Sequence, residues 1–225
     1  MAIATNDLTD WLTYVFERPI DPPREHWYFA PNAPDRDDLP PHPEILIAEA
    51  FENSGTLLAR FSDAQIGQGL EYLGNESCSA YMLTLLDPEI PFERRLRALR
   101  SFVPLFEQVM AVRCSPHLSH LDEKGANPLN GACYMWWDVL PFRFRDNSPE
   151  ELQWAGLVDE IAIILRRLLI IPHDACREST LHGIGHMVRP YPQLADFVDE
   201  FLASTDGLRP ELIAYAQRAR AGNVL

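Results

Sequence analysis

Apolar residues recur at intervals of three and four along most of this chain, the spacing that places them on one face of an α-helix. The segment 7–16 shows the pattern, with an apolar face made of Leu8, Trp11, Leu12 and Val15. No convincing alternation of apolar and polar residues extends beyond four or five positions, so the pattern does not require a β-sheet. The predicted fold class is therefore all-α.

Local signals predict where several helices begin. Ser62 precedes a helical pattern and has Gln65 three residues later, which is the spacing of a capping box. Ser148, Pro149 and two following glutamates predict the start of a helix that runs to about residue 171. Further helices are expected at 45–61, 76–86, 91–113, 174–188, 191–203 and 210–220. Pro104 should kink or split the helix at 91–113, because its ring cannot fit inside a regular helix.

The segment 19–43 departs from this pattern. It holds eight prolines, a density that blocks both helix and central strand. It also holds Trp27, Tyr28 and Phe29, which a disordered linker would not need. We expect an extended, proline-rich and acidic N-terminal arm that packs on the rest of the chain through these aromatic side chains.

About ten helices joined by short turns predict a single helical domain over residues 1–225. The domain is expected to be either a compact helical fold or a short HEAT-like α-solenoid. The helix pairs from Pro149 onward have HEAT-like lengths and spacings, whereas no clear repeat covers the whole chain.

Charge and composition narrow the classes of function. The 225 residues include 19 Lys and Arg against 33 Asp and Glu, a net charge of −14, which argues against nucleic-acid or anionic-membrane binding. The longest apolar stretch, 161–171, is interrupted by two arginines and is too short to cross a bilayer. The first residues lack the features of a secretory signal, and the four cysteines are scattered, so a cytoplasmic protein with reduced thiols is expected. Lys124 is the single lysine, and such arginine-rich usage is typical of GC-rich bacterial genomes.

The most distinctive segment is Cys176-Arg-Glu-Ser-Thr-Leu-His182-Gly-Ile-Gly-His186. Glu178, His182 and His186 are four residues apart and line one helical face, and histidines at this spacing can bind zinc. The three residues cannot easily share one ion, because positions 178 and 186 lie about 12 Å apart along a helix axis. A metal site would need ligands from elsewhere, and the candidates are His117 and His120 in the loop 114–123.

A structural role for these histidines is the favoured alternative. Gly183 and Gly185 each cost about 1 kcal/mol inside a helix, which is tolerable where a neighbouring helix approaches closely. His182 and His186 would then bond buried carbonyl groups or carboxylates such as Glu178. On this interpretation the chain needs no metal or cofactor.

The segment 176–186, together with Cys133-Tyr-Met-Trp-Trp-Asp138, resembles motifs of a family of uncharacterised bacterial proteins of helical, HEAT-like type. The resemblance rests on a CxESxLHGxGH-type sequence and on the tryptophan pair. It implies a helical fold, and it implies no mechanism because the family has no assigned activity.

Two further groups are candidate partner-binding residues. Asp35, Asp37 and Asp38 form an acidic cluster, and Trp136 and Trp137 could stack on a ligand or partner, although at least one is expected in the core. The leading hypothesis is a non-catalytic binding or scaffold protein, of the type of an immunity or antitoxin-like inhibitor, whose acidic surface engages a basic protein. The alternative is a zinc-type hydrolase in which His182 and His186 bind the metal and Glu178 or a loop acid acts as base.

Overall fold

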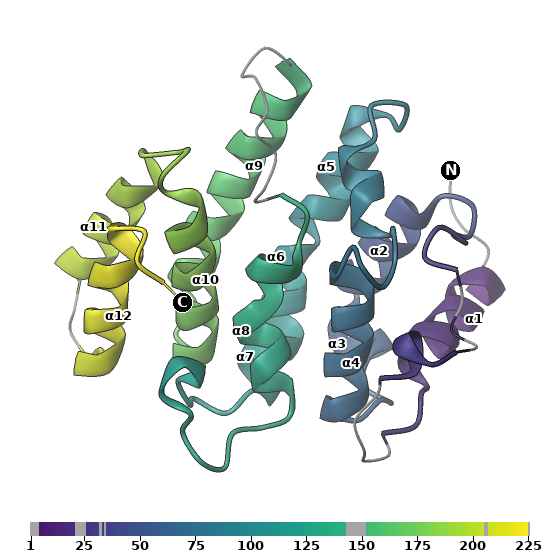
Figure 1. Cartoon of the computed structure of the whole chain (residues 1–225), viewed down its shortest axis with the longest axis horizontal. Coiled ribbons are helices and arrows are strands. Elements are labelled where there is room, and N and C mark those ends of the chain that lie inside the picture. The colour runs from purple at the N-terminus through teal and green to yellow at the C-terminus, as the bar shows by residue number, and fades with distance from the viewer. Residues whose placement is uncertain are drawn as a thin grey trace.

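Helices lie side by side across the long axis of the molecule and follow one another in chain order from one end to the other (Figure 1). This computed structural model describes residues 5–20, 26–31, 33, 35–142, 152–204 and 207–224. In those residues all regular secondary structure is helical, which confirms the predicted all-α class. The α-helices are α1 (Thr5–Phe16), α2 (Pro43–Glu52), α3 (Ser54–Leu57), α4 (Asp63–Gly74), α5 (Phe92–Arg100), α6 (Phe102–Leu105), α7 (Ala111–Arg113), α8 (Leu129–Val139), α9 (Leu152–Leu169), α10 (Asp174–Met187), α11 (Leu194–Ala203) and α12 (Pro210–Arg220).

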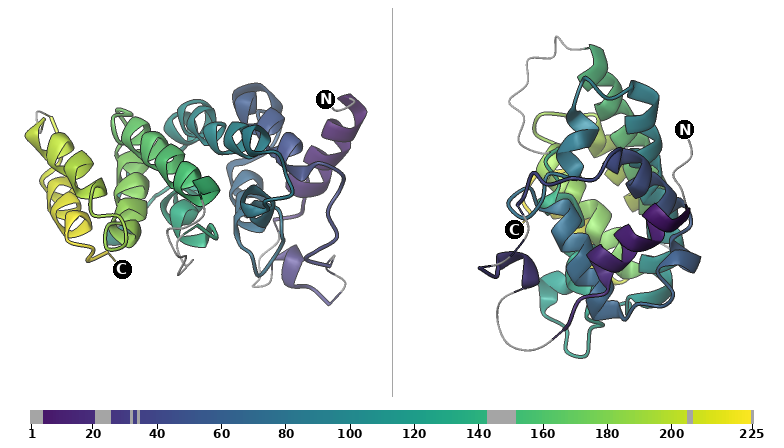
Figure 2. Two further views of the ribbon diagram at one scale, coloured as in Figure 1. Left: turned by 90° about the horizontal axis from the view of Figure 1, so that it is seen from above. Right: turned by 90° about the vertical axis from the view of Figure 1, so that its right-hand side faces the viewer.

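The longer helices form two layers. In one layer α4 packs on α8, α8 on α10 and α10 on α12, and in the other α2 packs on α5, α5 on α9 and α9 on α11. Figure 2 shows the row from above and from one end, with α1 and α12 at opposite ends. Because each layer buries its apolar face against the other, the core runs along the whole row. None of the described helices combines the length and apolar character needed to span a bilayer.

Several predicted helices are present with different boundaries. The capping box is confirmed, because Gln65 N–H donates to Ser62 Oγ (3.3 Å) and Ser62 N–H donates to Gln65 Oε1 (3.0 Å) at the start of α4. The segment 91–113 is divided into α5, α6, a π-helical turn (Phe106–Met110) and α7, as expected from Pro104. The predicted start at Ser148 and Pro149 lies outside the described residues.

Two predicted helices are shorter than expected, because side chains compete for the backbone groups. The segment 45–61 breaks after α2, where Asn53 Nδ2 donates to Glu49 O (3.0 Å) and Gly55 N–H donates to Gln108 Oε1 (2.9 Å). The segment 76–86 keeps only the 3₁₀ helix Met82–Leu86. Its first residues form a turn in which Ser79 Oγ donates to Tyr72 O (2.6 Å).

The aromatic side chains of segment 19–43 pack on the helices. Tyr28 is buried, and the Trp27 ring lies 4.5 Å from the ring of Tyr72 on α4. The guanidinium of Arg18 lies 4.1 Å from the centre of the Trp27 ring, in a cation–π contact. The extended arm as a whole stays a prediction, because residues 21–25, 32 and 34 lie outside the described part of the chain.

Helices α8 and α10 approach each other closely. A Cβ atom on Gly183 of α10 would lie 2.6 Å from Cγ of Trp137 on α8, and one on Gly185 would lie 2.6 Å from Val224. The two glycines therefore let neighbouring segments contact the α10 backbone. This is the packing explanation that the sequence favoured for them.

We expect Gly183→Ala to destabilise the protein by about 2 kcal/mol, because overpacking outweighs the gain in helix propensity. Its melting temperature should fall by about 4–8 °C in calorimetry. Gly131→Ala in α8 is the matched control, since a Cβ atom there meets nothing within 4 Å. That variant should melt at or above the wild-type temperature. Equal effects of the two substitutions would contradict the close contact.

Candidate metal centre

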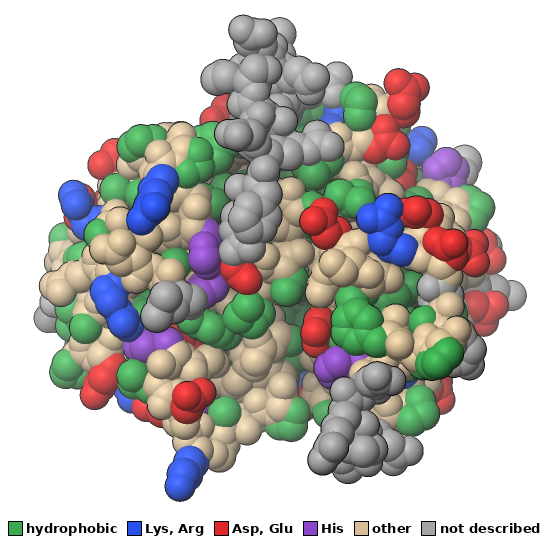
Figure 3. Space-filling view, viewed as in Figure 1, with side chains coloured by type: hydrophobic (Ala, Val, Ile, Leu, Met, Phe, Trp, Pro, Cys, Tyr) green, Lys and Arg blue, Asp and Glu red, His purple; other side chains and the backbone are tan. Residues whose placement is uncertain are grey.

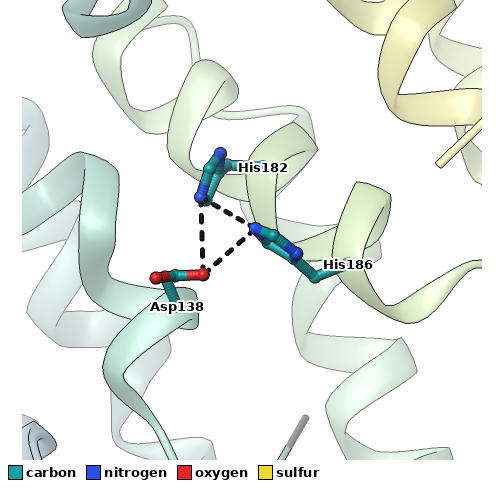
Figure 4. A group of neighbouring side chains, drawn as sticks. All are labelled: Asp138, His182 and His186. Carbon is teal, nitrogen blue, oxygen red and sulfur yellow. Dashed lines mark hydrogen bonds and ion pairs between the residues drawn. The ribbon is translucent and has the colours of Figure 1, made fainter. Parts of the chain in front are cut away.

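Three side chains from α8 and α10 converge on one point. His182 and His186 lie one turn apart on α10, and Asp138 lies in the last turn of α8 (Figure 4). His186 Nε2 is 3.0 Å from Asp138 Oδ1 and 3.1 Å from His182 Nε2, and His182 Nε2 is 3.8 Å from Asp138 Oδ1. Within the described residues this is the one group of three metal-capable side chains whose ligand atoms lie within 4.8 Å of one another.

The packing of α8 on α10 brings these residues together. The Ser179 hydroxyl donates to the carbonyl oxygen of Cys133, and the thiol of Cys133 lies 3.7 Å from the carbonyl oxygen of Ala175. Both contacts fix the register of one helix against the other. The i, i+4 spacing of the histidines then directs both rings toward Asp138 at the end of α8.

The triangle has the size of a metal coordination face. Tetrahedral zinc with ligand bonds of about 2.0–2.1 Å separates neighbouring ligand atoms by about 3.3–3.4 Å. The observed separations of 3.0, 3.1 and 3.8 Å bracket that value. The three side chains therefore need only small shifts to bind one divalent ion.

Solvent exposure differs among the three side chains. The His182 side chain is 1% exposed, whereas those of His186 and Asp138 are 24% and 21% exposed. One side of the group is thus anchored in the core and the other side lies near the surface. Asp138 also lies in the C-terminal turn of α8, where the negative end of the helix dipole disfavours an anion. A cation beside Asp138 would offset this effect.

Tyrosines behind the group orient His182. The Tyr215 hydroxyl lies 2.7 Å from His182 Nδ1 and 3.1 Å from the hydroxyl of Tyr134. Burial raises the pKa of Tyr215 far above its usual range, so the hydroxyl keeps its proton. It can donate this proton to Tyr134 and accept the Nδ1–H of His182, which leaves His182 Nε2 with a lone pair facing the cluster. Metal-bound histidines have this kind of partner on the other ring nitrogen.

Glu178 is held by a loop and lies outside the group. Its carboxylate is fully buried and accepts hydrogen bonds from the backbone N–H groups of Ser119 (2.8 Å) and His120 (3.0 Å). His120 Nδ1 lies 2.5 Å from Glu178 Oε1, and the His120 ring stacks on Tyr215 at 4.3 Å. Glu178 and His120 therefore secure the loop against the site. His117, the other predicted ligand from this loop, is also outside the group.

The member of the group that the sequence analysis did not name is Asp138. The sequence placed it in the distinctive tryptophan segment, and a carboxylate directly after Trp136 and Trp137 was the available signal. What the sequence could not supply was the contact between α8 and α10. His117 and His120, which the sequence offered to complement the two histidines, lie outside this group, and Asp138 lies within it.

The two predicted partner-binding groups have different environments. Trp136 and Trp137 are 1% and 4% exposed, and both rings pack on Phe102, so the expectation that at least one lies in the core is confirmed. Asp35, Asp37 and Asp38 are exposed. Arg36 forms an ion pair with Asp37 at 2.9 Å, which offsets part of this local negative charge. On the face shown in Figure 3, acidic and basic side chains are interspersed.

Comparisons of the chain with profiles of known protein families, with curated proteins and with solved structures found no match.

We expect Glu178→Gln to lower stability by about 2 kcal/mol, because its amide would place N–H groups against the backbone donors of the loop. The melting temperature should fall by about 4–8 °C, and amide exchange should accelerate in residues 118–123. Glu76→Gln, at an exposed position, is the control and should melt like the wild type. A Glu178→Gln protein with wild-type stability would show that the carboxylate does not hold the loop.

Proposed function

We propose that this protein is a metal-dependent hydrolase of the zinc type, with a divalent ion held by His182, His186 and Asp138. The observation that carries the proposal is the triangle of Nε2, Nε2 and Oδ1 atoms with sides of 3.0–3.8 Å. Two histidines and one carboxylate are a recurring ligand set of catalytic zinc, in which the fourth position is left for water.

The contacts favour a metal centre over purely structural histidines. A structural role predicts that the rings bond buried carbonyl groups or carboxylates such as Glu178, and the 3.0 Å contact of His186 with Asp138 also fits that role. A metal centre accounts in addition for the two Nε2 atoms, which lie 3.1 Å apart and share one carboxylate oxygen. One N–H group of a histidine can bond either the other histidine or the carboxylate. A cation interacts favourably with both nitrogen lone pairs and the carboxylate at once.

The partial exposure of His186 and Asp138 supports a catalytic centre. A bound divalent ion would lower the pKa of a coordinated water to about 7 and supply hydroxide at neutral pH. Glu178 is not proposed as the base, because loop donors surround its carboxylate. Glu123, a loop acid, is held by Arg209, whose hydrogen bonds keep the pKa of Glu123 at about 2.

Tag-free protein should contain about one equivalent of zinc or a similar divalent metal after reconstitution and desalting. His186→Ala should lose it, because two of the three ligands do not hold the ion against buffer exchange. His26→Ala, which removes an exposed histidine outside the cluster, should keep the metal. Elemental analysis measures all three proteins. Wild type without metal, or His186→Ala with full metal, would overturn the centre.

The reconstituted protein should hydrolyse at least one substrate in a panel of activated esters, phosphodiesters and peptide amides. The rate should rise with pH through about 7, as the coordinated water loses its proton. A chelator should abolish turnover, zinc should restore it, and His186→Ala should be inactive beside an active His26→Ala. Stoichiometric metal without turnover on any substrate would contradict the hydrolase assignment and leave a non-catalytic metal centre.

A binding or scaffold function remains a second proposal, favoured by the exposure of Asp35, Asp37 and Asp38 in a chain of net charge −14. In it, the acidic surface engages a basic protein, as an immunity or antitoxin-like inhibitor would. We also propose that the two-layered row belongs to the HEAT-like class of α-solenoids. Its support is the succession of helices that pack on their neighbours along each layer.

A further inference from the structure

A groove of about 650 Å³ lies between α4 and α8. Its wall on α4 includes Gly67, and its wall on α8 includes Gly131 and Ala132, small residues that leave space between the helices. The buried ring of Trp136 also lines it. The groove has the volume of a small-molecule site, and its lining is mostly apolar. Asp138, His182 and His186 are not among the lining residues.

A buried polar side chain also lines this groove. Gln68 is 8% exposed, and its side-chain amide has no hydrogen-bond partner in the described part of the chain. Both atoms of this amide retain some solvent-accessible surface. Water can therefore reach the amide from the groove, and a ligand with a hydrogen-bonding head group would replace that water with a direct hydrogen bond.

Two exposed apolar side chains flank the groove. Ile20 is 43% exposed and Met135 is 37% exposed, and both are among its lining residues. Together with Trp136 they provide an apolar surface for the body of a ligand. Methionine side chains suit such surfaces because they adapt to different shapes.

The negative charge beside the groove determines which ligand head groups are favoured. Glu71 lines it and has a 38% exposed side chain, and its carboxylate lies 3.7 Å from the ring of His26. A carboxylate or phosphate on a ligand would be repelled by Glu71 and by the overall charge of −14. Uncharged or cationic head groups avoid this cost.

We propose that the groove between α4 and α8 binds a small amphiphile with an apolar body and an uncharged or cationic head, which hydrogen-bonds the Gln68 amide. This site is separate from the proposed metal centre, and its occupancy does not require a metal. A metal-free protein should therefore bind the ligand as the full protein does.

The test uses the uncharged fluorophore N-phenyl-1-naphthylamine, displaced by dodecanol below its solubility limit or by dodecylamine or laurate below their micelle concentrations. We expect saturable binding, with dodecanol and dodecylamine displacing the probe at least about tenfold more effectively than laurate. Glu71→Gln should narrow the difference between dodecylamine and laurate, because it removes the repelling charge. Gln68→Met should weaken the binding of dodecanol about fivefold, because it removes the hydrogen-bonding amide.

Gly131 lines the groove, and a Cβ atom there meets nothing within 4 Å, so Gly131→Leu is expected to place its side chain in the groove. It should weaken binding of the fluorophore at least about tenfold while the protein stays folded. Ala203→Leu adds a leucine to an exposed position of α11 and is the matched control. Absence of saturable binding, equal binding by Gly131→Leu and wild type, or preference for laurate would each overturn the proposal. Loss of metal in His186→Ala without loss of fluorophore binding would show that the two sites are independent.

Discussion

The contact between α8 and α10 is the constraint on which the site depends. Gly183 lets the ring of Trp137 lie against the α10 backbone, and the Ser179 hydroxyl bonds the Cys133 carbonyl on the opposite helix. These short contacts leave little freedom for either helix to slide, because both use backbone atoms. The end of α8 is thereby held beside one face of α10, and Asp138 meets two histidines that are 44 and 48 residues away in sequence.

Beside this contact, polar side chains form a chain in which each contacts the next. His182 is fixed from behind by Tyr215, and the His120 ring stacks on Tyr215. His120 is in turn bonded to the buried carboxylate of Glu178. Such a chain restricts the rotamer of each member, so the orientations of His182 and His120 are set by neighbouring side chains. The glutamate that the sequence offered as a ligand serves to position the loop.

Helix α8 contributes to two environments. Trp137 and Asp138 face α10, whereas Gly131, Met135 and Trp136 line the groove beside α4. Gly131 and Asp138 are seven residues apart, so they lie near one line along the helix, about two turns from each other. One short helix therefore connects the polar cluster that contains Asp138 with an apolar groove.

The sequence by itself determined the elements. Apolar periodicity gave the all-α class, Ser62 and Gln65 marked the start of α4, and Pro104 marked the division of a long helix, because these signals act within one or two helical turns. It also identified His182 and His186 as neighbours, since their spacing is local. Competition by side chains such as Asn53 shortened helices in ways that periodicity does not register. The addition of Asp138 and the assignment of Glu178 to the loop were decided only by tertiary structure, because they depend on which helices pack together and in what register.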